Sequence, residues 1–454
     1  MLFRLIFNQD NCNRLLKEGQ RYDLKAACIV KNVSNVSQMI LHEDMLIKTN
    51  IMFIYLQLIF SLTRTLIVKN DVTSFYQDMI QKKISFLCES GRLTFDNGFY
   101  TYQIFLKENH TDYTNFTDAD QLWIMLTNNG CSSIMHAYDK YGPFIYQNKQ
   151  LDLHPYSYNK FINLLYIDQP FGVGISEGFG ERNDNAIKIL EFIEEFLVNN
   201  GIPNMKIMLY GKEYVSQLFS KIIENSIGYN LNIEGIILEN AWVSPIHQIG
   251  YYGSFLYQLG LIDDQRRDEI YYNTTQIQVQ LLNQNFTNIT QLKTLVNQSQ
   301  SELKLIEDDR NNNLEDITQF INDHSFKLFD INKDDYQFCN DTQHEKAQQQ
   351  LLISTLFEIE MILNRQKKVI VLVKQIQFTV TTPGIVTWVN QLRWQHITKW
   401  RMSEKKFIQE EYYDKAQNFT KNKTVGYIKQ FDKLKYIVAY DELFKLLNQI
   451  IIDN

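Results

Sequence analysis

Short apolar segments alternate with amphipathic helical segments along most of this chain, from about residue 85 onward. Apolar runs of five to seven residues without a polar face are typical of strands that are buried on both sides. Between two of them, residues 185–198 place Ile189, Ile193 and Phe196 on one face of a helix. This alternation predicts an α/β fold, in which helices cover both faces of a mostly parallel central sheet. The predicted strands are 120–126, 163–167, 206–210, 233–238, 368–373 and 434–439, and a last helix is predicted over 441–452.

Residues 262–345 interrupt this alternation. The segment is rich in Asn, Gln and charged residues, and it keeps apolar residues such as Ile277, Leu281 and Leu292 at helical spacing. A flexible linker would be rich in Gly or Pro instead. We therefore expect an inserted helical cap of about these bounds, within a domain that spans 85–454.

The N-terminal region carries a different signal. Lys48 precedes an apolar run over 51–62, and Ser61 and Thr63 follow as small residues where cleavage could occur. This order is typical of a secretory signal, and the run is short for a membrane span, although a buried helix or strand remains an alternative. Residues 45–65 are thus a predicted signal peptide or signal anchor. Translation would then start at Met45 or Met52, or 1–44 would be an extension of unknown role.

Charge and cysteine spacing exclude some classes of function. The formal net charge of -7 argues against nucleic acid as a partner, because phosphate binding needs clustered positive charge. None of the five cysteines forms a C-x-x-C pair or a Cys/His cluster with zinc spacing. We therefore expect neither a metal site nor a cofactor.

Four blocks of the chain resemble the serine carboxypeptidases, which are α/β-hydrolase-fold peptidases that remove C-terminal residues. The similarity extends over about 85–450 and keeps the order and spacing of the blocks. It implies an α/β-hydrolase fold, but a shared fold does not establish an activity. The blocks are 120–144 ("DQLWIMLTNNGCSSIMHAYDKYGPF"), 154–176 ("HPYSYNKFINLLYIDQPFGVGIS"), 240–263 ("NAWVSPIHQIGYYGSFLYQLGLID") and 369–394 ("VIVLVKQIQFTVTTPGIVTWVNQLRW").

The nucleophile turn of that family has the sequence Gly-Glu-Ser-Tyr-Ala-Gly, which corresponds here to 211–216. Glu213 occupies the position of the serine, and a glutamate cannot supply an alkoxide. Lys212 replaces the glutamate that would hold the carboxylate of the substrate, whereas Tyr214 is kept. Val215 occupies a position where the family has a small residue, so we expect the strain of this turn to be relaxed.

The other catalytic parts are also altered. The family's Asn-Gly-Gly run, whose backbone N–H groups face the substrate, corresponds to Leu126, Thr127 and Asn128. The orienting aspartate corresponds to Thr379. The loop with the catalytic histidine is deleted after Tyr440, and the last histidine of the chain, His396, lies on a predicted surface helix.

The resemblance also pairs Cys131 with Cys339 in a disulfide and leaves Cys88 without an assigned partner. A disulfide fits an oxidising compartment. With the predicted signal and several N-x-[ST] sequons, it favours a glycosylated protein of the secretory pathway, located outside the cell or in a vacuolar or lysosomal lumen. If residues 45–65 stay uncleaved, the chain would be anchored in the membrane.

We therefore predict a catalytically inactive member of this family that binds a peptide, a glycan or another protein. The alternative is an active carboxypeptidase or acyl hydrolase with non-standard catalytic residues. Glu213 could form an ester intermediate, or the nucleophile could have moved to Ser216, Ser132 or Ser133. Lys212 could meet a carboxylate ligand, although a charge pair with Glu213 or a solvated lysine is the simpler interpretation.

Overall fold

A computed structural model describes most of the chain from Leu66 onward. The predicted signal segment 45–65, the residues 1–44 and the predicted last helix 441–452 lie outside the described residues. Within the described part, no helix combines the length and the apolar character that a membrane crossing requires. The described residues are 66–117, 120–127, 129–139, 142–179, 184–212, 215–283, 289–303, 314–331, 336–376, 380–414 and 419–440.

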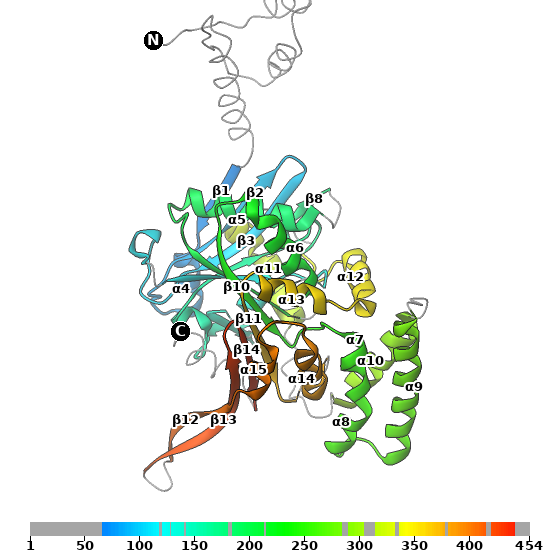
Figure 1. Cartoon of the computed structure of the whole chain (residues 1–454). Coiled ribbons are helices and arrows are strands. Elements are labelled where there is room, and N and C mark those ends of the chain that lie inside the picture. The colour runs from blue at the N-terminus through cyan, green and yellow to red at the C-terminus, as the bar shows by residue number, and fades with distance from the viewer. Residues whose placement is uncertain are drawn as a thin grey trace, which may run out of the picture. The chain divides into compact units, whose positions relative to one another are not determined.

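One large sheet of 12 strands organises the described part of the chain (Figure 1). Its order is β1-β2-β3-β7-β4-β9-β10-β11-β14-β13-β12, with β8 paired to β3. The strands are β1 (Leu66–Asp71), β2 (Cys88–Phe95), β3 (Gly98–Phe105), β4 (Gln121–Leu126), β7 (Asn163–Ile167), β8 (Glu177–Gly178), β9 (Lys206–Lys212), β10 (Asn232–Glu239), β11 (Lys368–Lys374), β12 (Lys405–Asp414), β13 (Phe419–Phe431) and β14 (Leu434–Ala439). A separate two-stranded sheet pairs β5 (Phe144–Gln147) with β6 (Gln150–Leu153).

The centre of the large sheet is parallel and its two flanks are antiparallel. Strands β7, β4, β9, β10, β11 and β14 all run in one direction. The first flank contains β1 to β3 and the other contains β13 and β12. The six predicted strands form this parallel centre, which confirms the predicted α/β-hydrolase architecture.

Helices cover both faces of the sheet because alternate residues of each strand point in opposite directions. In β4, Leu122 and Ile124 pack into one hydrophobic core, and Trp123 and Met125 pack into the other. The first core includes α5 (Asn185–Asn199), α6 (Val215–Asn225), α13 (Leu356–Asn364), α14 (Thr382–Gln391) and α15 (Ile397–Met402), and the second includes α4 (Thr73–Ile80) and α11 (Leu314–Phe329).

Helices fill the predicted insertion, but they do not form one unit. Helices α9 (Asp264–Leu282) and α10 (Ile289–Leu303) lie beside α8 (Tyr252–Gln258), as Figure 1 shows. In contrast, α11 buries Phe320 and Ile321 against the sheet. Two short helices lie near the ends of the insertion: α7 (Pro245–Gln248) precedes it, and α12 (Asp341–Gln348) begins just before it ends.

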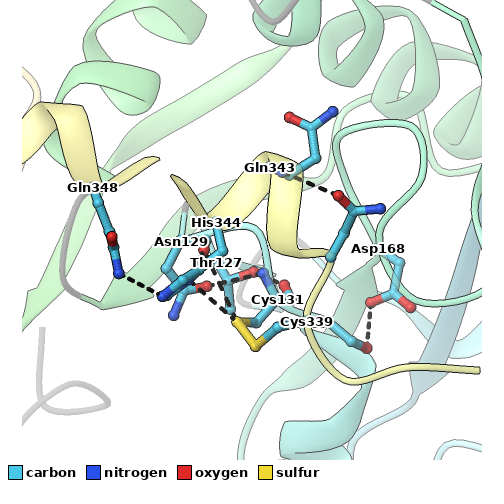
Figure 2. Close-up of a disulfide and its surroundings, with 10 residues drawn as sticks. Thr127, Asn129, Cys131, Asp168, Cys339, Gln343, His344 and Gln348 are labelled. Carbon is cyan, nitrogen blue, oxygen red and sulfur yellow. Dashed lines mark hydrogen bonds between the residues drawn. A yellow bond between two sulfur atoms is a disulfide. The ribbon is translucent and has the colours of Figure 1, made fainter. Parts of the chain in front are cut away.

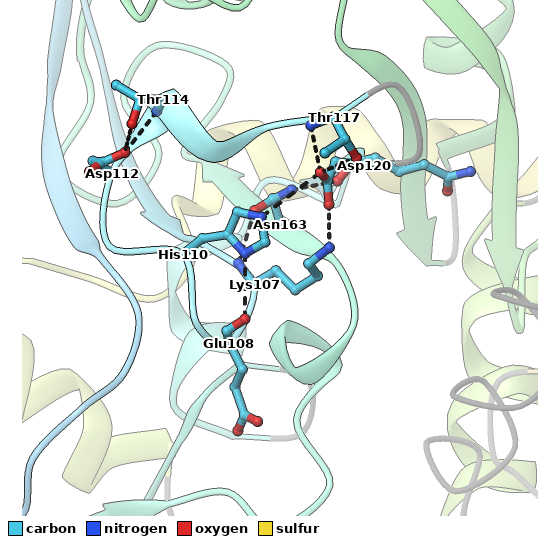
Figure 3. Close-up of polar contacts among 9 residues, drawn as sticks. Lys107, Glu108, His110, Asp112, Thr114, Thr117, Asp120 and Asn163 are labelled. Atoms are coloured by element: carbon cyan, nitrogen blue, oxygen red, sulfur yellow. Dashed lines mark hydrogen bonds and ion pairs between the residues drawn. The ribbon is translucent and has the colours of Figure 1, made fainter.

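A polar network joins the end of β3 to the beginning of β4 (Figure 3). Asp120 is buried, accepts a hydrogen bond from Lys107 Nζ, and accepts two more from the backbone N–H (2.8 Å) and hydroxyl (2.9 Å) of Thr117. Burial alone would raise the pKa of the Asp120 carboxyl, but these bonds outweigh it and hold the pKa below its ordinary value. The carboxylate is therefore a structural part of the fold.

We predict that Asp120→Asn lowers the free energy of unfolding by about 1–3 kcal/mol at pH 7, because Lys107 loses its counter-charge. The depressed pKa means that the wild-type contribution is present above the unfolded pKa of about 4 and is lost as the pH falls below it. Urea unfolding between pH 3 and 7 measures both effects. If the free energy of unfolding of the variant fell below pH 4 as steeply as that of the wild type, this role would be contradicted.

Candidate functional site

The carboxyl ends of β4, β9 and β10 meet at one edge of the sheet, where parallel α/β sheets bind ligands. The register places Leu126 beside Gly211 and Lys212 beside Glu239. The predicted nucleophile turn lies here, since only residues 213 and 214 separate β9 from α6. Glu213 and Tyr214 themselves lie outside the described residues.

Gly211 shows how closely β9 and α6 approach each other. A Cβ atom at this position would lie 2.6 Å from Val215 Cγ1 and 2.8 Å from the backbone oxygen of Leu126. Val215 is fully buried in the core. Strand and helix are therefore in tight contact at this glycine. The expected relaxation of the turn stays a prediction, because Glu213 and Tyr214 lie outside the described residues.

Lys212 contacts a buried carboxylate on the neighbouring strand. Its Nζ lies 3.8 Å from Oε1 of Glu239, whose side chain is only 3% exposed, and Tyr210 donates a hydrogen bond to the other carboxylate oxygen. A buried polar group is costly unless it is paired or hydrogen-bonded, so the contacts with Lys212 and Tyr210 offset the cost of burying the Glu239 carboxyl group. Sequence analysis missed Glu239, because its proximity to Lys212 follows only from the register of β9 and β10.

The residues that replace the family's oxyanion run are engaged in internal contacts. Leu126 is buried in the hydrophobic core. The Thr127 hydroxyl donates to the backbone oxygen of Cys131, and the Thr127 carbonyl accepts from Gln169 Nε2. Asn128 lies outside the described residues. Both described residues thus contribute to packing and to loop geometry.

A cavity of about 10 Å³ lies at the ends of β4 and β9, which is about the minimum volume for one water molecule. The cavity is lined by Met125, Leu126, Thr127, Ser133, His136, Tyr210, Gly211 and Lys212.

The predicted disulfide between Cys131 and Cys339 is confirmed and closes 208 residues of chain (Figure 2). Backbone hydrogen bonds run on both sides of it, from Ser132 N to Phe338 O (2.7 Å) and from Asn340 N to Gly130 O (2.9 Å). Cys88 is free and buried. The loop after β4 is therefore held to the segment that leads into α12.

His344 lies beside this disulfide, as Figure 2 shows. Its Nδ1 is 2.6 Å from the backbone oxygen of Asn129, and its Nε2 is 2.9 Å from Gln348 Nε2. Both ring nitrogens of His344 thus lie within hydrogen-bonding distance of neighbouring polar atoms. Cys131, Cys339 and His344 have the residue types of a zinc site, but the disulfide consumes both sulfurs and leaves no thiolate ligand.

Asp168 is fully buried in the loop that follows β7. Its Oδ1 accepts from Ser132 Oγ (2.7 Å) and from the backbone N–H of Ile134 (3.1 Å). Burial raises the pKa of this carboxyl to about 6, although the hydrogen bonds act in the opposite direction. A Cβ at Gly174, which has a φ of +59°, would collide with this carboxylate. Asp168 thus joins two loops from inside the protein: the loop after β7, to which it belongs, and the loop after β4, which contains Ser132 and Ile134.

The three serines considered as a relocated nucleophile are all buried and bonded elsewhere. Ser132 Oγ donates to Asp168, Ser133 Oγ donates to the backbone oxygen of Ile167, and Ser216 Oγ lies 2.6 Å from Thr355 Oγ1. A serine nucleophile needs an adjacent base. The contacts of Ser133 and Ser216 supply no such base. Ser132 does contact the carboxyl group of Asp168, but both residues are fully buried, so a substrate cannot reach them.

A serine–histidine contact that sequence analysis missed lies beyond β10. Ser244 Oγ is 2.7 Å from His247 Nδ1, and burial lowers the pKa of His247. Ser244 is fully buried where α7 begins. The sequence signal was present as a serine three residues before a histidine, a spacing that places both side chains on one face of a helical turn.

The remaining predicted positions cannot be assembled into a triad from the described residues. Thr379 and the segment after Tyr440 lie outside them. His396 is 3.8 Å from Asp432, which precedes β14 and so lies at the opposite end of that strand from the Lys212 edge. His396 is therefore remote from the candidate site.

Comparisons with known proteins agree with the observed architecture. A family model described as serine carboxypeptidase matches residues 129–441. The vitellogenic carboxypeptidase of Aedes aegypti is 30% identical over 148 residues, which cover 30% of this chain and 31% of the relative. The pheromone-processing carboxypeptidase of Candida tropicalis is 31% identical over 211 residues, or 42% of this chain and 29% of the relative. The matched segments thus span about a third of these relatives.

A solved structure resembles the whole domain. The prohormone-processing carboxypeptidase from Saccharomyces cerevisiae superposes with a TM-score of 0.66 and 18% identity, covering 81% of this chain and 90% of the other. At this level of identity the comparison establishes a shared fold. A shared fold does not establish a shared activity.

We predict that stability falls as the pH rises from about 4 to about 6, because the folded state keeps a proton on Asp168 that the unfolded chain releases. The stabilisation by protonated Asp168 is complete below the pKa of about 4 that this group has in the unfolded chain. It amounts to about 3 kcal/mol, at about 1.4 kcal/mol per pH unit. Asp168→Asn should flatten this part of a urea-unfolding pH profile. Asp120→Asn is the matched control and should leave the fall in place. A fall that persists in Asp168→Asn would contradict the assignment.

We also predict that replacing Cys131 and Cys339 together by serine lowers the free energy of unfolding by about 5 kcal/mol, because a long loop is released in the unfolded state. Cys88→Ala, which changes a buried cysteine without a disulfide, is the control and should cost about 1 kcal/mol. Urea denaturation without reductant compares the two. Equal losses would show that the bridge adds no stability.

Proposed function

The chain belongs to the serine carboxypeptidase family, and from this premise we propose that it is a catalytically inactive member that acts by binding. The observation that carries the proposal is Glu213 at the position of the nucleophile. Loss of one triad member alone costs about 10⁴-fold or more in rate. Thr379 at the acid position and the missing histidine loop extend the loss to all three groups.

The geometry at the sheet edge supports the same proposal. Lys212 is turned toward buried Glu239, so its charge is offset inside the protein. Leu126 and Thr127 contribute to packing and loop contacts where a carboxypeptidase would present N–H donors. These contacts support a site in which the family's carboxylate-binding glutamate and oxyanion run have been replaced.

The proposed ligand is a peptide end, a glycan or another protein, bound without metal or cofactor. We place the chain in the secretory pathway, either outside the cell or in a vacuolar or lysosomal lumen. The disulfide supports this location, because such bonds persist in oxidising compartments. The predicted signal over 45–65 and the sequons support it from the sequence.

An active hydrolase with non-standard residues is the second candidate. The contact between Ser244 and His247 favours it, since a lowered His pKa keeps the ring neutral and able to accept a proton. Burial of Ser244 argues against it, because a nucleophile has to reach its substrate. An assay for reactive serines separates the two candidates.

We predict that a fluorophosphonate probe does not label the purified protein under conditions that label an active serine carboxypeptidase. The probe reports any activated serine wherever it lies, so relocation would not hide it. Heat-sensitive labelling would overturn the inactive assignment. Its loss in Ser244→Ala but not in Ser216→Ala would then identify the nucleophile.

A further inference from the structure

Strand β12 forms the last edge of the large sheet. It pairs with β13 on one side only, and the two strands extend away from the centre of the sheet (Figure 1). Lys405, Lys406 and Gln409 are exposed, and the large apolar side chain of Phe407 is 66% exposed. A long edge strand with free N–H and C=O groups is a template for pairing with another strand.

The sequence of this edge is complementary to itself. Residues 405–411 are Lys-Lys-Phe-Ile-Gln-Glu-Glu, with two lysines and two glutamates at equal distances from Ile408. In an antiparallel pair of two such strands centred on Ile408, Lys406 lies opposite Glu410 and residue 405 lies opposite residue 411. A shift of the centre by one residue in either direction removes every lysine–glutamate pair.

The lysines and Glu410 of this edge have no ion-pair partner within the described part of the chain, and Lys405 Nζ lies 4.7 Å from the centroid of the Tyr427 ring. Neither Lys406 nor Glu410 takes part in an ion pair there. Lys405 lies opposite Lys429 in the register of β12 and β13. Like charges in directly opposed positions are unfavourable, and the pKa of Lys429 is lowered by burial first and by the charge of Lys405 second. A carboxylate placed opposite Lys405 would relieve this repulsion.

We propose that β12 is a homodimer interface, at which two copies of the chain pair antiparallel through their β12 edges about a two-fold axis at Ile408. The sheets of the two copies then join into one. A two-fold contact uses the same patch on both copies, as self-complementary charges require. Because the axis is perpendicular to the sheet, Ile408 keeps its face toward the core in each copy.

Edge lysines also occur on strands that avoid pairing. That protective role requires only a charge that repels a second strand. The arrangement here differs, because the glutamates convert repulsion into attraction in a single register. Opposite charges across a strand pair stabilise it, whereas like charges destabilise it, so this edge selects one partner orientation.

Sedimentation equilibrium of the full chain tests the proposal. The wild type should show a concentration-dependent monomer–dimer equilibrium in the micromolar range that weakens with added salt. Lys405→Glu/Lys406→Glu and Glu410→Lys/Glu411→Lys should each raise the dimer dissociation constant at least tenfold. A mixture of these two variants should form a heterodimer, because their edges complement each other.

The combined fourfold charge swap should dimerise like the wild type, since it restores every opposite pair. Lys82→Glu/Lys83→Glu is the matched control, because it reverses two adjacent exposed lysines elsewhere and should leave the dimer intact. A wild type that is monomeric at all concentrations would overturn the proposal. So would charge variants that dimerise normally, or a mixture that stays monomeric.

Discussion

In the centre of the sheet, β4, β9 and β10 pair in parallel, and their register places Leu126 beside Gly211 and Lys212 beside Glu239. Close packing of α6 on this ladder tolerates no Cβ at Gly211. The parallel register and the close packing of α6 together place the carboxyl ends of β4, β9 and β10 at one edge of the sheet. The loops that replace the catalytic parts of the family are built on that edge, so their positions follow from the sheet rather than from any chemistry they perform.

The parallel centre could be predicted from the sequence because burial on both faces leaves a continuous apolar pattern. The predicted strands 163–167 and 434–439 coincide with β7 and β14, and the others differ by one or two residues at their ends. The antiparallel flanks left no comparable signal. β12 alternates charged, aromatic and polar residues, which resembles the pattern of a solvated segment.

The candidate site was predicted only where the residues themselves carry the information. The bridge between Cys131 and Cys339 followed from the family resemblance and is confirmed. Glu213 and Thr379 stay predictions from the same resemblance, because both lie outside the described residues. The contact of Lys212 with Glu239 joins two strands that are far apart in the chain, so it depends on strand register. No local spacing rule could have found it.

Leu126, Thr127 and Lys212, which differ from the family pattern, all make stabilising contacts inside the protein. Active sites hold strained or unsatisfied groups, which cost stability and remain only where function requires them. In this chain Leu126 is buried in the core, Thr127 closes a local hydrogen bond, and Lys212 contacts a buried carboxylate. The side chain of each of these residues thus makes its contacts inside the protein. These internal contacts stabilise the sheet edge that corresponds to the catalytic edge of the family.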